Sequence, residues 1–282
     1  MKDDATPELH SVSRKWSYTT GDGAVIWQLM FPETGHVVGQ KRVPATRRTS
    51  FFCLSSESGQ VLSDDFVLFS GTDPDSPAGD GWLVGFETTL GELVYCHAYA
   101  PGTPEHRGIW AVDLPGRQIV WQRPDIVFAA NLGTSFLAYR TSVFAGFPER
   151  DYLLLDPVTG RDLELLGRDH ERANVMRLAA ETEESRQGII LPRHAPPQDD
   201  GSGQASPEES IMLGELRIDA VHRNCPPAGW ESRISVSLGE RMVYVDLMAT
   251  GARRLPFNNF LIRDFSLYYI KGNDELICVN IL

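Results

Sequence analysis

The sequence predicts an all-β protein built as a β-propeller, with five blades as the first interpretation and six as the alternative. Short runs rich in Val, Ile, Phe, Trp and Tyr follow one another along the chain, and turns separate them, with 25 glycines and 18 prolines in 282 residues. Runs of this length and composition, bounded by turn residues, are typical of β-strands. A hairpin of similar sequence also recurs, which indicates a structural repeat.

The recurring hairpin has a short apolar strand, often an Asp, a turn that ends in Gly, and a second strand. It occurs at 51–62, 109–121, 152–165 and 243–255. The side chain of Asp or Ser can hydrogen-bond to the backbone of its own turn, and Gly readily takes the positive φ at the end of the turn. The repeat units start near residues 51, 108, 150 and 241, so the gaps are 57, 42 and 91 residues. Because a four-stranded blade takes about 40–50 residues, the last gap is about one blade too long.

The long gap contains an acidic segment, residues 169–210. Residues 171–181 are mostly helix formers, whereas residues 196–207 are polar and rich in Pro, Gly and Ser. We therefore interpret 169–210 as a helix-plus-flexible-loop insertion within a single propeller domain of residues 1–282. A sixth blade is the alternative for this segment. Residues 1–12 are expected to form a disordered tail.

The two ends of the chain predict how the propeller closes. Residues 276–282 match the first strand of the repeat hairpin, and the chain stops where its partner strand should begin. Residues 14–18 resemble that missing partner. An N-terminal strand that completes the last blade would remove two unpaired sheet edges at once. A ring closed by the N-terminal strand is thus our first interpretation, and an array of β-sandwiches ranks third after the six-bladed propeller.

Charge and cysteine content exclude several classes of partner. The chain has 26 basic and 38 acidic side chains, a net charge of −12, which argues against nucleic acid or an anionic membrane surface as partner. No apolar stretch reaches the roughly 18 residues of a membrane span, and no secretory signal is recognised. The four cysteines lie far apart, as expected of free thiols in a reducing compartment. The predicted location is the cytoplasm, and the oligomeric state is left open.

The hairpin with Asp, Thr and Gly followed by Trp resembles the repeat of pyrroloquinoline-quinone-type β-propellers. The chain is also similar to an uncharacterised bacterial family described only as a domain of unknown function. That resemblance is carried by residues 82–87, 97–101 and 104–113, the acidic middle insertion and the hairpin at 270–272. The family implies no activity. Quinone dehydrogenases of this type are much larger and carry a vicinal cysteine pair, so no quinone or other cofactor is expected here.

His97, Glu105 and His106 are the candidate catalytic residues, because they lie close together between two predicted strands. Two imidazoles and a carboxylate can bind a metal ion or transfer a proton. The alternative is that Glu105 and His106 only brace a loop that Pro101 and Pro104 stiffen. The spacing matches no standard metal motif, so no metal is assigned.

Four basic residues form a second candidate site, for an anion. They are Lys41, Arg42, Arg47 and Arg48. Arginine can hold a phosphate or carboxylate through two parallel hydrogen bonds. A solvated turn around Pro44 is the alternative interpretation.

Because no catalytic motif stands at a specific spacing, the sequence favours a non-enzymatic scaffold or ligand-binding module. The alternative function is a hydrolase or lyase, with a metal or acid–base site built from His97, Glu105 and His106. Fold alone does not separate these two functions.

Overall fold

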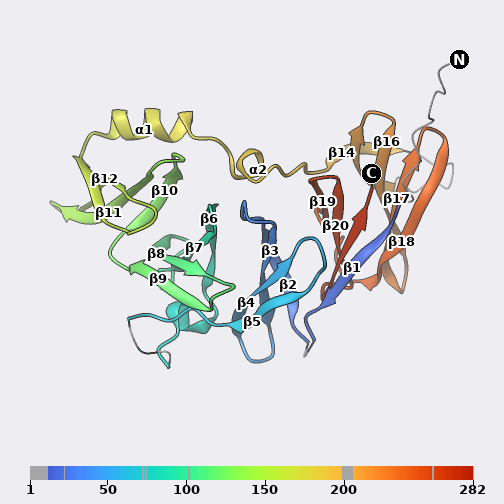
Figure 1. Ribbon diagram of the computed structural model, residues 1–282, viewed down its shortest axis with the longest axis horizontal. Helices are drawn as coiled ribbons and strands as arrows, with labels where there is room; N and C mark the ends of the chain where they lie inside the picture. The colour runs from blue at the N-terminus through green and yellow to red at the C-terminus, as the bar shows by residue number, and fades with distance from the viewer. Residues whose placement is uncertain are drawn as a thin grey trace, which may run out of the picture. The chain divides into compact units, whose positions relative to one another are not determined.

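The structure is a computed structural model that describes residues 12–21, 23–71, 73, 75–100, 102–198, 206–255 and 257–281. The chain forms two compact units. One is Thr20–Gln187, and the other combines Met1–Thr19 with Gly188–Leu282. Figure 1 shows the elements of both units. Residues 1–11 of the predicted tail lie outside the described residues.

The Thr20–Gln187 unit contains three blades, each an antiparallel sheet of four strands in chain order. The first blade consists of β2 (Val25–Met30), β3 (His36–Val43), β4 (Arg48–Ser55) and β5 (Val61–Phe66). A short 3₁₀ helix, η1 (Ala78–Gly81), precedes the second blade, which consists of β6 (Val84–Leu90), β7 (Leu93–Tyr99), β8 (His106–Asp113) and β9 (Gln118–Arg123). The third blade consists of β10 (Val127–Asn131), β11 (Phe136–Phe144), β12 (Phe147–Leu155) and β13 (Asp162–Gly167).

The middle strands of these blades are apolar on both faces because other parts of the unit cover both faces. In β4, the four residues Phe51 to Leu54 are all 0% exposed. The first and second blades share one hydrophobic cluster, in which the ring centroids of Phe51 and Phe86 lie 5.0 Å apart. Full burial of a phenylalanine side chain contributes roughly 1.5–3 kcal/mol. The predicted apolar strands are therefore the packing surfaces of the blades.

The other unit contains two blades. One is a five-stranded sheet of β14 (Arg193–Gln198), β15 (Ser206–Leu213), β16 (Leu216–Cys225), β17 (Gly229–Leu238) and β18 (Arg241–Ala252). The last blade has the strand order β1-β21-β20-β19, and its strands are β1 (Ser13–Thr19), β19 (Phe260–Arg263), β20 (Ser266–Lys271) and β21 (Glu275–Asn280). A hydrophobic cluster that contains Ile234, Leu267 and Ile277 joins the two sheets.

The N-terminal strand completes the last blade, as predicted. β1 pairs antiparallel with β21, with Trp16 opposite Cys278 and Tyr18 opposite Leu276. Trp16 also packs edge-on against Tyr268 of β20, with ring centroids 5.9 Å apart. Closure of the five blades into a ring stays a prediction.

The segment after the third blade is helical in its first half. α1 (His170–Ala179) begins at Asp169, whose carboxylate accepts a hydrogen bond from the backbone N–H of Arg172 at 3.0 Å. Such an N-cap satisfies one of the amides that lack a partner inside the helix. Ala173 packs against Leu137 and Leu166 of the third blade, and α2 (Glu183–Arg186) follows. Figure 1 shows α1 beside β10, β11 and β12.

The second half of the segment contains two strands where the sequence predicted a flexible loop, and residues 199–205 of that loop lie outside the described residues. The structure has strands at Arg193–Gln198 and Ser206–Leu213, and β15 pairs with β16 over six residues of each strand. In β15, Glu209 and Ile211 are both buried. Residues 196–207, which are polar and rich in Pro, Gly and Ser, have the sequence pattern of a loop, although the two ends of this range belong to β14 and β15. The polar partners of Glu209, which are His222 of β16 and the backbone N–H of Asn258, lie later in the chain and explain its burial.

The described residues thus form five antiparallel sheets, and the prediction of an all-β fold of five propeller blades with a helical insertion after the third is confirmed. The division into two compact units is a feature that the sequence did not indicate. No helix among the described residues has the length and apolar character needed to cross a membrane.

Candidate active site

Three strands of the second blade each contribute one polar side chain to a compact cluster. Glu87 comes from β6, His97 from β7 and His106 from β8. The strand register skips Glu87 between the pairs Phe86–Cys96 and Thr88–Tyr95, and a second irregularity lies at His97 on the β7–β8 side. A β-bulge of this kind turns a side chain away from the regular alternation of the strand. We infer that the two bulges aim Glu87 and His97 at each other.

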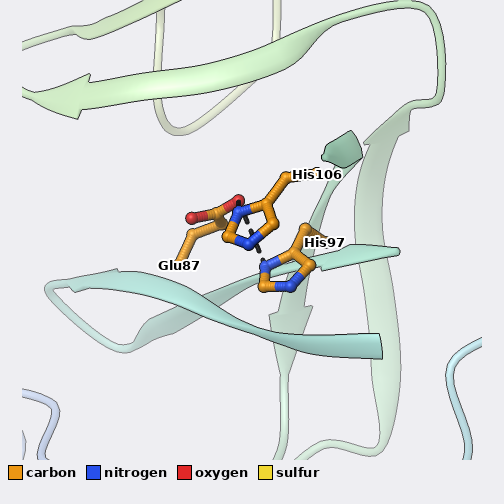
Figure 2. A group of neighbouring side chains, drawn as sticks. All are labelled: Glu87, His97 and His106. Carbon is orange, nitrogen blue, oxygen red and sulfur yellow. Dashed lines mark hydrogen bonds and ion pairs between the residues drawn. The ribbon is translucent and has the colours of Figure 1, made fainter. Parts of the chain in front are cut away.

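Both imidazoles face the same carboxylate oxygen, as Figure 2 shows. His106 Nδ1 lies 2.7 Å from Oε1 of Glu87, and His97 Nδ1 lies 3.1 Å from the same atom. The two rings are stacked, with centroids 3.6 Å apart and planes 9° from parallel. Tyr99 packs edge-on against both rings, at 4.8 Å from His97 and 5.1 Å from His106. The cluster is therefore held by packing as well as by hydrogen bonding.

Burial differs sharply among the three side chains. His97 is 2% exposed, Glu87 8% and His106 37%. His97 lies over Gly85, where a Cβ atom would stand 2.9 Å from its Cε1, so only glycine leaves room for the ring. His97 Nε2 has no hydrogen-bond partner among the described residues. Of the two imidazoles, only His106 is open to solvent to a substantial degree.

The electrostatics of the cluster favour a carboxylate next to an imidazolium. Burial opposes ionisation of Glu87, but the hydrogen bond from His106 and the nearby ring of His97 outweigh it and lower the pKa of this carboxyl. The hydrogen bond to Glu87 raises the pKa of His106, against a smaller opposing effect of burial. A raised imidazole pKa increases the fraction of protonated His106 near neutral pH.

His106 lines a cavity of about 700 Å³ in the Thr20–Gln187 unit. Besides His106, the walls include Glu105, Tyr139, Arg150, Tyr152 and His170. A volume in the range of 300–1,000 Å³ is usual for small-molecule sites. The carboxylate-bonded histidine thus stands at the wall of a space that can admit a substrate.

Among the described residues, the same three side chains form a group that could bind a metal ion. Their possible ligand atoms all lie within 4.8 Å of one another. A zinc ion bound by histidine needs ring nitrogens that converge on it at about 2.0–2.1 Å. The lone pairs of two rings stacked 9° from parallel run side by side and do not converge. One ring would have to turn out of the stack before both could bind one ion.

The structure brings together two of the three predicted catalytic residues. His97 and His106 meet, but their carboxylate partner is Glu87, whereas Glu105 lines the cavity outside the cluster. The sequence contained a signal for Glu87, since it is a lone acid in the otherwise uncharged strand from Val84 to Leu90. A buried carboxylate in such a strand requires polar partners on neighbouring strands.

Two of the four residues predicted to bind an anion have other contacts. Lys41 is 5% exposed, and its Nζ lies 2.7 Å from a carboxylate oxygen of Asp64. The guanidinium of Arg42 stacks on Trp27 at 4.4 Å and on Trp82 at 5.2 Å. Arg47 has a φ of 50° in the turn between β3 and β4, and Arg48 is exposed at the start of β4. An anion site at these four residues stays a prediction.

No protein-family model matches the chain, and no curated protein matches it in sequence. Among solved structures, a glycoside hydrolase candidate from Parabacteroides distasonis aligns over 100% of this chain and 96% of its own, with 7% identity and a TM-score of 0.32. A glycoside hydrolase candidate from Bacteroides ovatus aligns over 99% and 95%, with 8% identity and a TM-score of 0.34. The Dos1 propeller aligns over 91% and 67%, with 9% identity and a TM-score of 0.33.

These comparisons correct the prediction of a non-enzymatic scaffold, because the similar structures are mainly glycoside hydrolases and phosphorylases. At these identities and TM-scores, the likeness assigns no activity or substrate to this chain. The chemistry has to be argued from the Glu87–His97–His106 cluster itself.

Proposed function

We propose that the Thr20–Gln187 unit carries the active site of an acid–base enzyme, a hydrolase or a lyase. In this proposal His106 gives a proton to, or takes one from, a substrate bound in the adjoining cavity. The observation that carries the proposal is the 2.7 Å contact between His106 Nδ1 and Glu87 Oε1 at the cavity wall. A positioned acid–base side chain contributes typically 10²–10⁴-fold to a reaction rate.

Glu87 performs two tasks in this arrangement. Its carboxylate accepts a hydrogen bond from the Nδ1–H of His106, which leaves Nε2 as the nitrogen that can exchange a proton with substrate. It also stabilises the imidazolium form, in agreement with the raised pKa of His106. Because Glu87 is only 8% exposed and has a lowered pKa, it stays ionised while His106 cycles between its two forms.

His97 acts as a positioning residue. Its ring is sandwiched between the backbone at Gly85 and the ring of His106. It can fix the plane of His106 and exclude water from one side of the Glu87 carboxylate. Exclusion of water strengthens the Glu87–His106 interaction, because electrostatic energies rise as the local dielectric constant falls.

The first test needs no substrate. The pKa of His106, measured by NMR titration, is expected to lie above about 6.5, the usual value for histidine, and to fall towards that value in Glu87→Gln. His36→Gln is the matched control, because His36 lies in the same unit and contacts only Thr34 among the side-chain hydrogen bonds of the described residues. An unchanged His106 pKa in Glu87→Gln would refute the proposed pair.

The second test measures turnover. Wild type is assayed against nitrophenyl esters, nitrophenyl glycosides and phosphate esters, and any activity found is measured again in His106→Gln and in the His36→Gln control. Loss of the acid–base group is expected to lower the rate by about 10²–10⁴-fold. Full activity in His106→Gln would overturn the proposal. Stoichiometric bound metal that disappears in a His97→Ala/His106→Ala variant would replace the proton-transfer role with metal binding.

The cytoplasmic location, the absence of nucleic-acid or membrane partners and the relation to quinoprotein-type repeats stay predictions from the sequence. The proposed chemistry depends on none of them. It depends on the second blade and on the cavity beside it.

A further inference from the structure

We propose that the substrate of the cavity beside His106 carries an oxyanion group, a carboxylate or a phosphate ester, and that Arg150 binds it with help from Arg107. The inference rests on the proposed function, because it names the class of molecule on which His106 would act. It is carried by the distribution of charge along the cavity wall.

Besides histidines, five acidic or basic side chains line the cavity, namely Glu105, Arg107, Asp125, Glu149 and Arg150. Two of the acids have arginine partners nearby. Asp125 lies 2.8 Å from Arg123 and 3.4 Å from Arg140, and these contacts lower its pKa to about 2. Glu149 lies 2.6 Å from the guanidinium of Arg168. Once these pairs are set aside, the cavity lining has two arginines, Arg107 and Arg150, and one carboxylate, that of Glu105.

Arg150 has the features of a prepared anion site. Its guanidinium lies 4.6 Å from the ring centroid of Tyr139, which also lines the cavity. None of the ion pairs found among the described residues joins Arg150 or Arg107 to an acid closer than 4.0 Å. The pKa of Arg150 is raised chiefly by a hydrogen bond with the side chain of Tyr152, and the charge of Glu105 adds to the effect without forming an ion pair. A guanidinium has five N–H donors, so one that is stacked on Tyr139 and bonded to Tyr152 keeps further donors for a carboxylate or phosphate.

The placement of Arg107 connects this anion site to the proton-transfer site. Arg107 directly follows His106 in β8, and both line the cavity. An oxyanion held by the two arginines would bring the rest of a small substrate close to His106. The chain as a whole carries a charge of −12 and repels anions at long range, so attraction to this cavity has to come from these local cations.

The test is isothermal titration calorimetry with inorganic phosphate and, separately, with acetate, which distinguishes phosphate from carboxylate recognition. Wild type is expected to bind at least one of them, and Arg150→Gln to bind it about 10–100-fold more weakly, the usual value of a charged hydrogen bond. Arg150→Lys should bind with intermediate affinity, because lysine keeps the charge but loses the planar fork. Arg161→Gln is the control, since Arg161 is exposed in the same unit and does not line the cavity.

Several outcomes would overturn the inference. They are the absence of binding of both anions by wild type, equal affinity in wild type and Arg150→Gln, or equal weakening by Arg161→Gln. Thermal unfolding checks that each variant is folded, and Arg107→Gln replaces Arg150→Gln if the latter does not fold. His106→Gln separates the two proposals. Retained anion binding with unchanged turnover in His106→Gln would refute the proposed function and leave the anion site standing.

Discussion

Each unit of the protein contains a cluster of carboxylate and histidine side chains, and the two clusters differ in how they meet solvent. The cluster in the Thr20–Gln187 unit is Glu87, His97 and His106. The cluster in the other unit is Glu209 of β15, His222 of β16 and Ser232 of β17. Because both combine a glutamate with histidine on three adjacent strands, the presence of these residue types alone does not tell a catalytic site from a structural network.

The second cluster is closed and its hydrogen bonds are satisfied. His222 Nδ1 lies 2.8 Å from the hydroxyl of Ser232, and His222 Nε2 lies 3.1 Å from Oε2 of Glu209. The other oxygen of Glu209 accepts a hydrogen bond from the backbone N–H of Asn258 at 2.9 Å. Glu209, His222 and Ser232 are all 0% exposed. The Ser–His–Glu connectivity resembles a nucleophilic triad, but no substrate can reach a fully buried serine.

The first cluster differs on both counts. His106 is 37% exposed at a cavity wall, and His97 Nε2 has no hydrogen-bond partner among the described residues. An unsatisfied buried polar atom destabilises a fold and calls for an explanation in the structure. The comparison teaches that access to solvent and incomplete hydrogen bonding, more than composition, distinguish the Glu87 cluster, for which we propose a catalytic role, from the Glu209 cluster. The following predictions test that distinction.

The largest expected effect is on the closed cluster. Glu209→Ala should lower the free energy of unfolding by about 3–5 kcal/mol, because it removes a buried carboxylate and leaves both His222 and the backbone N–H of Asn258 without their acceptor. Urea denaturation measures this change. Glu208→Ala is the control, since Glu208 points to the opposite face of β15 and should change stability by less than about 0.5 kcal/mol. A loss below about 1 kcal/mol for Glu209→Ala would contradict a structural role for this cluster.

An intermediate effect is expected at Gly85. Gly85→Ala places a Cβ atom 2.9 Å from Cε1 of the buried His97 ring, and overpacking of this kind costs about 1–3 kcal/mol. A double-mutant cycle with His97→Ala isolates the contact, because the alanine removes the ring that the new methyl group meets. The cost of Gly85→Ala should then largely disappear. An equal cost with and without His97 would show that the contact is not its cause.

The smallest expected effect is the pH dependence of folding stability that Glu87 and His106 produce. The lowered pKa of Glu87 stabilises the fold above about pH 4.3, its unfolded value, and this contribution is lost as pH falls through the folded pKa. The raised pKa of His106 stabilises the fold below about pH 6.5, and this contribution is lost as pH rises through the folded pKa. The stability difference between wild type and Glu87→Gln should therefore be greatest between about pH 4.3 and 6.5.

The size of this effect is limited by solvent. His106 is 37% exposed, so screening should keep its contribution below about 1 kcal/mol. Denaturation of both proteins from pH 3 to pH 9 measures the difference. A difference that does not vary with pH would contradict the coupling between Glu87 and His106.

The sequence by itself determined most of the strands, though not β14 and β15, together with the hairpin repeat, the helix after the third blade and the N-terminal strand that pairs with β21. Each of these follows from local information, because apolar runs, turn residues and helix formers act over a few neighbouring positions. His97 and His106 were also identified from the sequence, since they lie nine residues apart in the strands on either side of one loop.

Only the tertiary structure decided which carboxylate joins the two histidines. Glu105 is nearer in sequence, but the bulges of β6 and β7 bring Glu87 to them instead. A bulge depends on the pairing of two strands, so the sequence of one strand does not predict it. The same holds for β15, where Glu209 is buried because His222 and Asn258 meet it from other parts of the chain. Polar groups are buried only together with partners, and the fold alone assembles partners that lie far apart in sequence.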